Sequence, residues 1–348
     1  MNNRCAMVNR TKLIINALMY FLLLSSCHDD QDKANFVLTY PDYFPKPYYQ
    51  SAKNPLTQEG FELGRSLFFD PILSNDDAVS CASCHHQAFA FADKNIRFSQ
   101  GIDNRVGNRN SPPIFNLAWQ PIFMWDGGIN HLEVMPLAPI TNELEMGANL
   151  SNVVSKLNHH ASYKKRFQSV FGRDTIDSQK LFFALAQYMS YLVSCDSKYD
   201  QFRQGKISFS ADELDGYQIF MRKCANCHQE PLFTDFSLRN NGLSSDGKDL
   251  GYGRITLIES DNNKFKVPTL RNIALTSPYM HDGRFSTLHQ VLDHYSNGVQ
   301  SFSNLDPFLS NKDRIGIDLT DNEKEKLLLF LNTLTDNTFI TNHLYSEL

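Results

Sequence analysis

The sequence predicts a mainly α-helical protein with two domains and long loops. Apolar residues recur at helical spacing behind capping residues, and no clear alternation typical of strands is found. A Cys-X-X-Cys-His unit occurs once in each half of the chain, at 81–85 and 224–228. The 348 residues are 42% hydrophobic and 12% aromatic, which is enough for the cores of two domains.

The duplicated unit is the attachment motif of c-type haem. Its two thiols form thioethers with the haem vinyl groups, and the adjacent His binds the iron. A zinc site with two Cys pairs usually keeps them about 15 to 20 residues apart, whereas these pairs lie in separate halves of the chain. The sequence therefore predicts two cytochrome c-like haem domains with two covalently bound haems. The predicted haem-binding residues are Cys81, Cys84 and His85 in the first unit and Cys224, Cys227 and His228 in the second.

The N-terminus predicts a lipoprotein signal peptide over residues 1–27. Basic residues precede an apolar run at 13–24, and Cys27 follows Leu-Ser-Ser. Acylation of the Cys27 thiol after cleavage would tether the protein to a bacterial membrane. We expect an exported, lipid-anchored protein on the periplasmic side or the surface of the cell envelope. An ordinary signal peptide is the alternative.

The first haem unit falls in a predicted N-terminal domain at 55–204. An extended linker rich in Tyr and Pro precedes it, over 28–54. A short helix is predicted at 61–69, before an Asp-Pro pair. Longer helices are predicted at 149–171 and 178–194.

A second domain is predicted over 205–348, after a Gln-Gly pair. Ser210 opens a helix through a capping box, and this helix leads to the second haem unit. Thr320 does the same for a final helix that ends near Leu334. Packing of this final helix on the first domain is left open.

The charge pattern excludes one class of partner. The formal net charge is −5, and no basic stripe interleaved with aromatic residues is found. We therefore expect no nucleic-acid binding.

Six short motifs accompany the haem units in one order. They are RNSP at 109–112, WDG at 125–127, EMG at 145–147, LRN at 270–272, PYMHDG at 278–283 and FLNTL at 330–334. Over residues 55–336 this order resembles the bacterial di-haem cytochrome c peroxidase/MauG family. The resemblance implies an N-terminal haem where peroxide reacts, a C-terminal haem that takes in electrons, and one calcium ion between the domains.

The resemblance implies catalytic roles for Glu145 and Trp125. Glu145 matches the acidic residue over the distal haem face, and a carboxyl in an apolar pocket can have a pKa raised enough for general acid/base work. A carboxylate favourably placed before the helix at Asn149 is the alternative. Trp125 matches the indole that relays electrons between the haems. A core Trp is the alternative, although the following Asp-Gly-Gly favours a loop.

The chain departs from the family pattern in two places. Met135 stands where many relatives have Gln, ten residues after the Trp. Residues 99–104 contain no His, although many bacterial peroxidases carry there the distal His that caps the N-terminal iron. The resemblance then implies an open, five-coordinate haem, as in MauG. We expect surface or hydrogen-bonding roles for His86 and His131.

The sixth ligand of the second haem has two candidates. Apolar residues at helical spacing from Leu288 to Tyr295 form a stripe that can cover a haem face. Tyr295 lies where peroxidase relatives carry an axial Met and MauG an axial Tyr. A phenolate lowers the reduction potential of iron, whereas a thioether raises it. Met280 is the competing ligand, and a core role for Tyr295 is the remaining alternative.

The calcium ion is implied by the resemblance alone. It would be held by the side-chain oxygen of Asn110 and the carbonyls of Thr276 and Pro278, completed by water. Oxygen ligands suit this hard cation.

We therefore expect a di-haem peroxidase that reduces hydrogen peroxide to water. The electrons would come from a small donor protein, a cytochrome c or a cupredoxin. The alternatives are a MauG-like enzyme that oxidises a protein side chain and a di-haem electron carrier without peroxidase activity. The sequence leaves open the identity of the donor and the formation of a homodimer.

Overall fold

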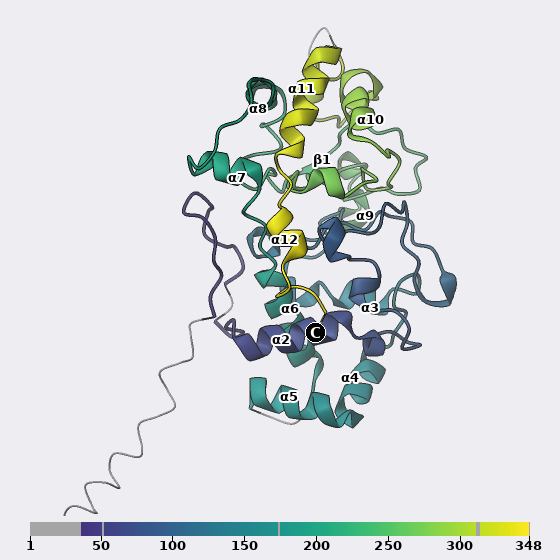
Figure 1. Cartoon of the computed structure of the whole chain (residues 1–348). Coiled ribbons are helices and arrows are strands. Elements are labelled where there is room, and N and C mark those ends of the chain that lie inside the picture. Colours follow the sequence, from purple (N-terminus) through teal and green to yellow (C-terminus); the bar gives the residue numbers. More distant parts are fainter. Residues whose placement is uncertain (1–35, 51, 173–174, 311–313, 348) are drawn as a thin grey trace, which may run out of the picture. The chain divides into compact units, whose positions relative to one another are not determined.

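The computed structural model describes residues 36–347 except 51, 173–174 and 311–313. Leu38–Leu348 form one compact unit (Figure 1). The expected signal peptide and its lipidation residue, Cys27, lie outside the described residues, so both stay predictions. Within the described part of the chain, no helix has the length and apolar character needed to cross a bilayer.

The expected mainly α class with long loops is confirmed (Figure 1). The helices are α2 (Gln58–Phe69), α3 (Leu137–Thr141), α4 (Leu150–His159), α5 (Ala161–Phe171), α6 (Ser178–Tyr191), α7 (Lys198–Arg203), α8 (Ala211–Lys223), α9 (Gly253–Thr256), α10 (Leu288–Asp293), α11 (Asp321–Asn332) and α12 (Asn337–Thr341). Strands β1 (Leu238–Arg239) and β2 (Phe265–Lys266) pair antiparallel. Single turns of 3-10 helix occur in the loops, among them Cys81–Ser83 within the first haem unit.

Helices α2 and α6 pack closely in the first half of the chain. The close approach requires Gly64, because a Cβ atom there would lie 2.0 Å from the carbonyl oxygen of Ala184. The helix predicted from residue 61 begins earlier, at Gln58, since the Thr57 side chain accepts a hydrogen bond from Gly60 N.

The single helix predicted over 149–171 is two helices, α4 and α5. His160 separates them, because its backbone is extended rather than helical, with φ −90° and ψ 106°. The His160 ring then accepts a hydrogen bond from Tyr163 N and caps α5. The prediction was wrong here because a polar residue with helical neighbours gave no sign of the break.

In the second half of the chain, α8 packs against α11. Both predicted capping boxes form, with Ser210 opening α8 and Thr320 opening α11. A core of aromatic and aliphatic side chains lies between these helices. It includes Tyr199 of α7, which comes before the Gln-Gly pair that was expected to separate the domains.

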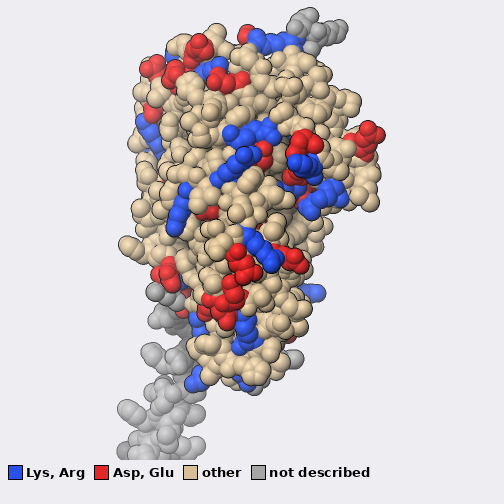
Figure 2. Space-filling model, turned by 90° about the vertical axis from the view of Figure 1, so that its right-hand side faces the viewer, with Lys and Arg blue, Asp and Glu red and all other residues tan. Residues whose placement is uncertain are grey.

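Segments far apart in the sequence join the two halves. α12 returns to the first half, where Gln87 Nε2 donates hydrogen bonds to the carbonyls of Phe339 and Asn342. Residues 38–50 pack near Trp119, whose indole N–H donates to Pro45 O at 2.7 Å. On the face drawn in Figure 2, acidic and basic side chains are interspersed.

Candidate haem sites

The first haem unit presents a histidine prepared to bind a metal. His85 Nδ1 lies 2.7 Å from the carbonyl oxygen of Phe91. A carbonyl can only accept, so the proton belongs on Nδ1 and the lone pair of Nε2 is available to iron. Burial lowers the pKa of His85 to about 4, which keeps the ring neutral. The ring therefore has the tautomer that an axial haem ligand needs.

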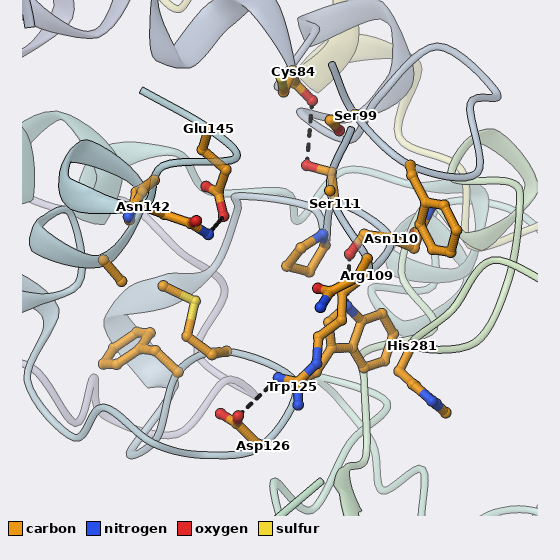
Figure 3. Close-up of a pocket in the computed structure, with 18 of the residues that line it drawn as sticks. Cys84, Ser99, Arg109, Asn110, Ser111, Trp125, Asp126, Asn142, Glu145 and His281 are labelled. Carbon is orange, nitrogen blue, oxygen red and sulfur yellow. Dashed lines mark hydrogen bonds and ion pairs between the residues drawn. The ribbon is translucent and has the colours of Figure 1, made fainter. Parts of the chain in front are cut away.

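The two cysteines of this unit lie beside the same space. Neither thiol of Cys81 or Cys84 forms a disulfide. Burial raises their pKa values, to about 12 for Cys81 and about 11 for Cys84. Together with His85 they line a cavity of about 1320 Å³. Figure 3 shows Cys84 at this cavity. The cavity is larger than the ~300–1,000 Å³ of most ligand pockets, and the donor set and the room both fit a c-type haem.

Glu145 lies in the wall of this cavity (Figure 3). The Asn142 amide donates to Glu145 Oε1 at 2.6 Å. The Glu145 side chain is accessible to solvent because it faces the open cavity. The surrounding chain still removes part of the water around the carboxylate, and this desolvation raises its pKa. The start of α4 is capped by a different residue, Asn149. Glu145 therefore lies in the cavity wall, and its catalytic role stays a prediction.

Trp125 connects residues of both halves. Its indole N–H donates to Asn110 O at 2.7 Å, and its carbonyl accepts from Lys266 N at 2.7 Å. The next residue, Asp126, is buried and forms ion pairs with Arg109, at 2.8 Å, and with Arg254. The loop is therefore fixed on both sides, and the indole forms part of the cavity wall.

Met135 also lines the cavity. Among the described residues that line it, the histidines are His85 and His281. The His281 ring stacks on Phe265 with 3.7 Å between centroids, which holds it against that side chain. His86 lies 3.6 Å from Asp93.

The second haem unit repeats the arrangement of the first. α8 leads directly to Cys224, its C-terminal cap. His228 Nδ1 lies 3.1 Å from Phe233 O, so Nε2 is again available, and burial lowers the pKa of the ring. Burial also raises the pKa of both thiols, to about 12 for Cys224 and about 11 for Cys227. These residues fit a second c-type haem.

Tyr295 lies on a turn of π-helix, His294–Gly298, that continues α10. Burial raises the pKa of its phenol to about 12, an Asn241 hydrogen bond opposes this, and the thiols of Cys227 and Cys224 raise the pKa further. The phenol is thus near the second haem unit. Asn241 Nδ2 also lies 3.6 Å from Met280 Sδ. The Asn241 side chain therefore contacts both candidate ligands, Tyr295 and Met280.

Comparison with known proteins decides the family. The sequence profile of the di-haem cytochrome c peroxidases matches residues 58–208. The chain is 35% identical over 310 residues to the methylamine utilization protein MauG of Methylorubrum extorquens, covering 84% of this chain and 82% of that protein. This chain belongs to the di-haem cytochrome c peroxidase/MauG family. It is also 33% identical over 290 residues to the cytochrome c551 peroxidase of Nitrosomonas europaea, covering 82% of each.

Solved structures agree with this assignment to the di-haem peroxidase/MauG family. A MauG-like protein associated with microbial copper homeostasis superposes with a TM-score of 0.80 at 31% identity, over 88% of this chain and 97% of the other. The di-haem peroxidase BthA of Burkholderia thailandensis has the same fold, with a TM-score of 0.73 at 21% identity, over 83% and 90% of the chains. The family makes this chain an oxidoreductase with two c-type haems, and its relatives include both MauG proteins and peroxidases.

The calcium ion expected from the family stays a prediction. The Asn110 Nδ2 group donates to Ile96 O and Arg97 O, and Oδ1 is the atom that the prediction assigns to the cation. Asn110, Thr276 and Pro278 are all buried. Asn110 N also donates to His281 O at 2.8 Å, so this residue lies near the segment that contains the other two.

Three further residues of these sites were not predicted from the sequence: Asn142, Asn241 and Lys266. Asn142 precedes Glu145 by three residues, and their backbones form a turn with a 2.9 Å hydrogen bond from Glu145 N. An Asn at this spacing was a usable signal. Asn241 and Lys266 reach the haem sites through tertiary structure, and no local pattern marks them.

Proposed function

We propose that this di-haem family member reduces hydrogen peroxide at its N-terminal haem site, using electrons from an external donor protein. The observation that carries the proposal is the position of Glu145. This carboxylate opens into the cavity that His85 and its two cysteines line, and its pKa is raised. A titratable group inside a haem cavity is suited to move protons of a bound substrate.

Peroxide reduction consumes two electrons and two protons and yields two water molecules. The bound haem supplies the iron site for peroxide and the electron exchange with it. Glu145 would take the proton from one peroxide oxygen and return it to the other, so that the O–O bond breaks and the protonated oxygen leaves as water. The remaining oxygen would take up the two electrons and two protons and leave as the second water. Asn142 holds Oε1, which leaves Oε2 to face the substrate.

Trp125 provides the connection along which electrons cross between the halves. Its indole lies in the cavity wall, and its carbonyl is bound to β2 of the second half. The residue is held through its indole N–H and through its backbone carbonyl, which suits a large conjugated ring to act as a relay. The donor in this proposal is a small cytochrome c or a cupredoxin.

One observation favours a second candidate, a MauG-like oxidation of a protein side chain. The Tyr295 phenol lies near the thiols of the second haem unit. Phenolate ligation lowers the potential of an iron site and so stabilises its oxidised form. A site of this kind is better at holding oxidising equivalents than at receiving electrons for peroxide.

Substitution of the cavity carboxylate tests the proposal. We expect Glu145→Gln to bind both haems and to lose about 10²- to 10⁴-fold in peroxide turnover, because a general acid/base contributes that much. Turnover is measured with reduced cytochrome c as donor. Glu143→Gln is the matched control, since Glu143 is exposed and its carboxylate lies 3.9 Å from Arg105. Near-normal turnover of Glu145→Gln would reject the role of Glu145.

The dependence of peroxide loss on an electron donor distinguishes the peroxidase from the MauG-like enzyme. The oxidised protein is mixed with peroxide, with and without reduced cytochrome c, and followed by electron paramagnetic resonance. Rapid peroxide loss only with the donor supports the peroxidase. Long-lived storage of two oxidising equivalents without the donor supports the MauG-like function, and no response to peroxide would contradict both.

A further inference from the structure

Among the basic residues that line the cavity of the first haem unit, one lacks the carboxylate partner that the others have. Six described Lys and Arg side chains line it, and five of these form ion pairs with carboxylates. The five are Arg97 and Arg284 with Asp282, Arg109 with Asp126 and Asp249, Arg254 with Asp126, and Lys248 with Asp246. Lys266 is the sixth, and no carboxylate among the described residues pairs with it.

The polar partners of Lys266 are neutral. Its Nζ donates to Gln120 Oε1 at 2.6 Å and lies 3.4 Å from Ile122 O. Burial lowers the pKa of Lys266 to about 8, because removal from water disfavours the ammonium form. A buried charge without a counter-ion is costly, and such charges are normally paired. The charge of Lys266 therefore has no counter-ion among the described residues.

The backbone directs Lys266 toward the first haem site. The residue belongs to β2 and pairs with Leu238 of β1. Its N–H donates to the carbonyl of Trp125, and its side chain lines the cavity that also holds Cys81. A residue from the second half of the chain thus places a positive charge in the cavity of the first haem unit and next to Trp125.

We propose that Lys266 pairs with a propionate carboxylate of the N-terminal haem and so directs the propionate edge of that haem toward Trp125. The haem brings two propionates into a cavity in which the other described basic side chains already have carboxylate partners. Lys266 is thereby a positioning residue. The proposal rests on haem occupancy of this cavity and does not require peroxide turnover.

The positive charge of Lys266 affects the reduction potential of the N-terminal haem. A positive group near a redox centre stabilises the state with the additional electron, and this interaction is strong in a low-dielectric interior. Lys266 therefore raises the reduction potential of the N-terminal haem. Removal of the charge lowers it.

Spectroelectrochemical titration of the haem-loaded protein without peroxide tests the inference. We expect Lys266→Met to lower the midpoint potential of the N-terminal haem by about 59 mV, a tenfold change in its one-electron equilibrium, and to leave the C-terminal haem unchanged. Lys266→Arg keeps the charge and should retain the potential. Lys264→Met is the control, since Lys264 pairs with Asp261. An unchanged N-terminal potential in Lys266→Met, or a shift of the C-terminal haem alone, overturns the proposal.

A crystal structure of the unmodified haem-loaded protein gives a second measurement that does not depend on folding of the variants. Lys266 Nζ within 4 Å of a propionate oxygen of the N-terminal haem supports the proposal. A longer distance refutes it. Both measurements are independent of peroxidase activity, so a protein that fails to reduce peroxide can still pass them.

Discussion

At the scale of single residues, the protonation of Glu145 depends on two opposing influences. Burial raises its pKa above the ordinary value of 4.5, and the hydrogen bond from Asn142 lowers it. The carboxylate form acts as the base, so we expect peroxide turnover to fall as the pH drops through this raised pKa.

Asn142→Ala removes the influence that lowers the pKa. The carboxylate loses a donor that favours its charged form, so its pKa rises further. We expect the acid limb of the kcat/KM profile to move to higher pH, as measured by turnover between pH 4 and 8. Asn152→Ala is the control, because Asn152 is exposed on α4. An acid limb that stays in place or moves to lower pH would contradict this account.

The haem attachment residues could be predicted from the sequence because their chemistry is local. Two thiols and a His within five residues suffice to specify the unit, and the structure places a backbone carbonyl beside Nδ1 of both rings. Lys266 could not be predicted, since its meaning depends on contacts with Gln120 and Trp125 in the other half of the chain.

At the scale of elements, capping accounts for the helix starts that were predicted correctly, and a tertiary contact accounts for a feature that was not predicted. Ser210 and Thr320 mark true starts, because a capping box satisfies backbone donors within one turn. The π-turn at His294–Gly298 was not foreseen. His294 Nε2 lies 3.1 Å from Asn241 O, a tertiary contact that no helical periodicity reveals.

This turn of π-helix sets the position of Tyr295, and single π-helical turns inside α-helices are frequent at functional sites. Tyr295→Phe keeps the ring and removes the oxygen. We expect the absorption and electron paramagnetic resonance spectra of the C-terminal haem to change and those of the N-terminal haem to stay the same. Met280→Leu should leave both unchanged. A change in Met280→Leu but not in Tyr295→Phe would assign the ligand to Met280.

At the scale of the whole molecule, a buried ion pair joins segments that are distant in sequence. Both side chains of Arg271 and Asp200 are 0% exposed, and the guanidinium donates two hydrogen bonds of 2.8 Å to the carboxylate. Arg271 also lies over the ring of Phe44, so α7, the LRN segment and the N-terminal segment meet here. The sequence marked Arg271 as part of a family motif, but its partner is 71 residues away.

Removal of one partner should therefore destabilise the molecule. The Arg271 charge lowers the pKa of Asp200 despite the opposing burial, so the stabilisation is present at neutral pH and is lost as the pH falls through that lowered pKa. We expect Asp200→Asn to lower the free energy of unfolding by about 3–5 kcal/mol at pH 7, because it leaves a buried guanidinium uncompensated. Denaturant unfolding of the haem-loaded protein measures this loss. Asp318→Asn, in an exposed pair with Arg314, should change stability by about 0–1 kcal/mol. Equal effects of the two substitutions would show that the buried pair does not hold these segments together.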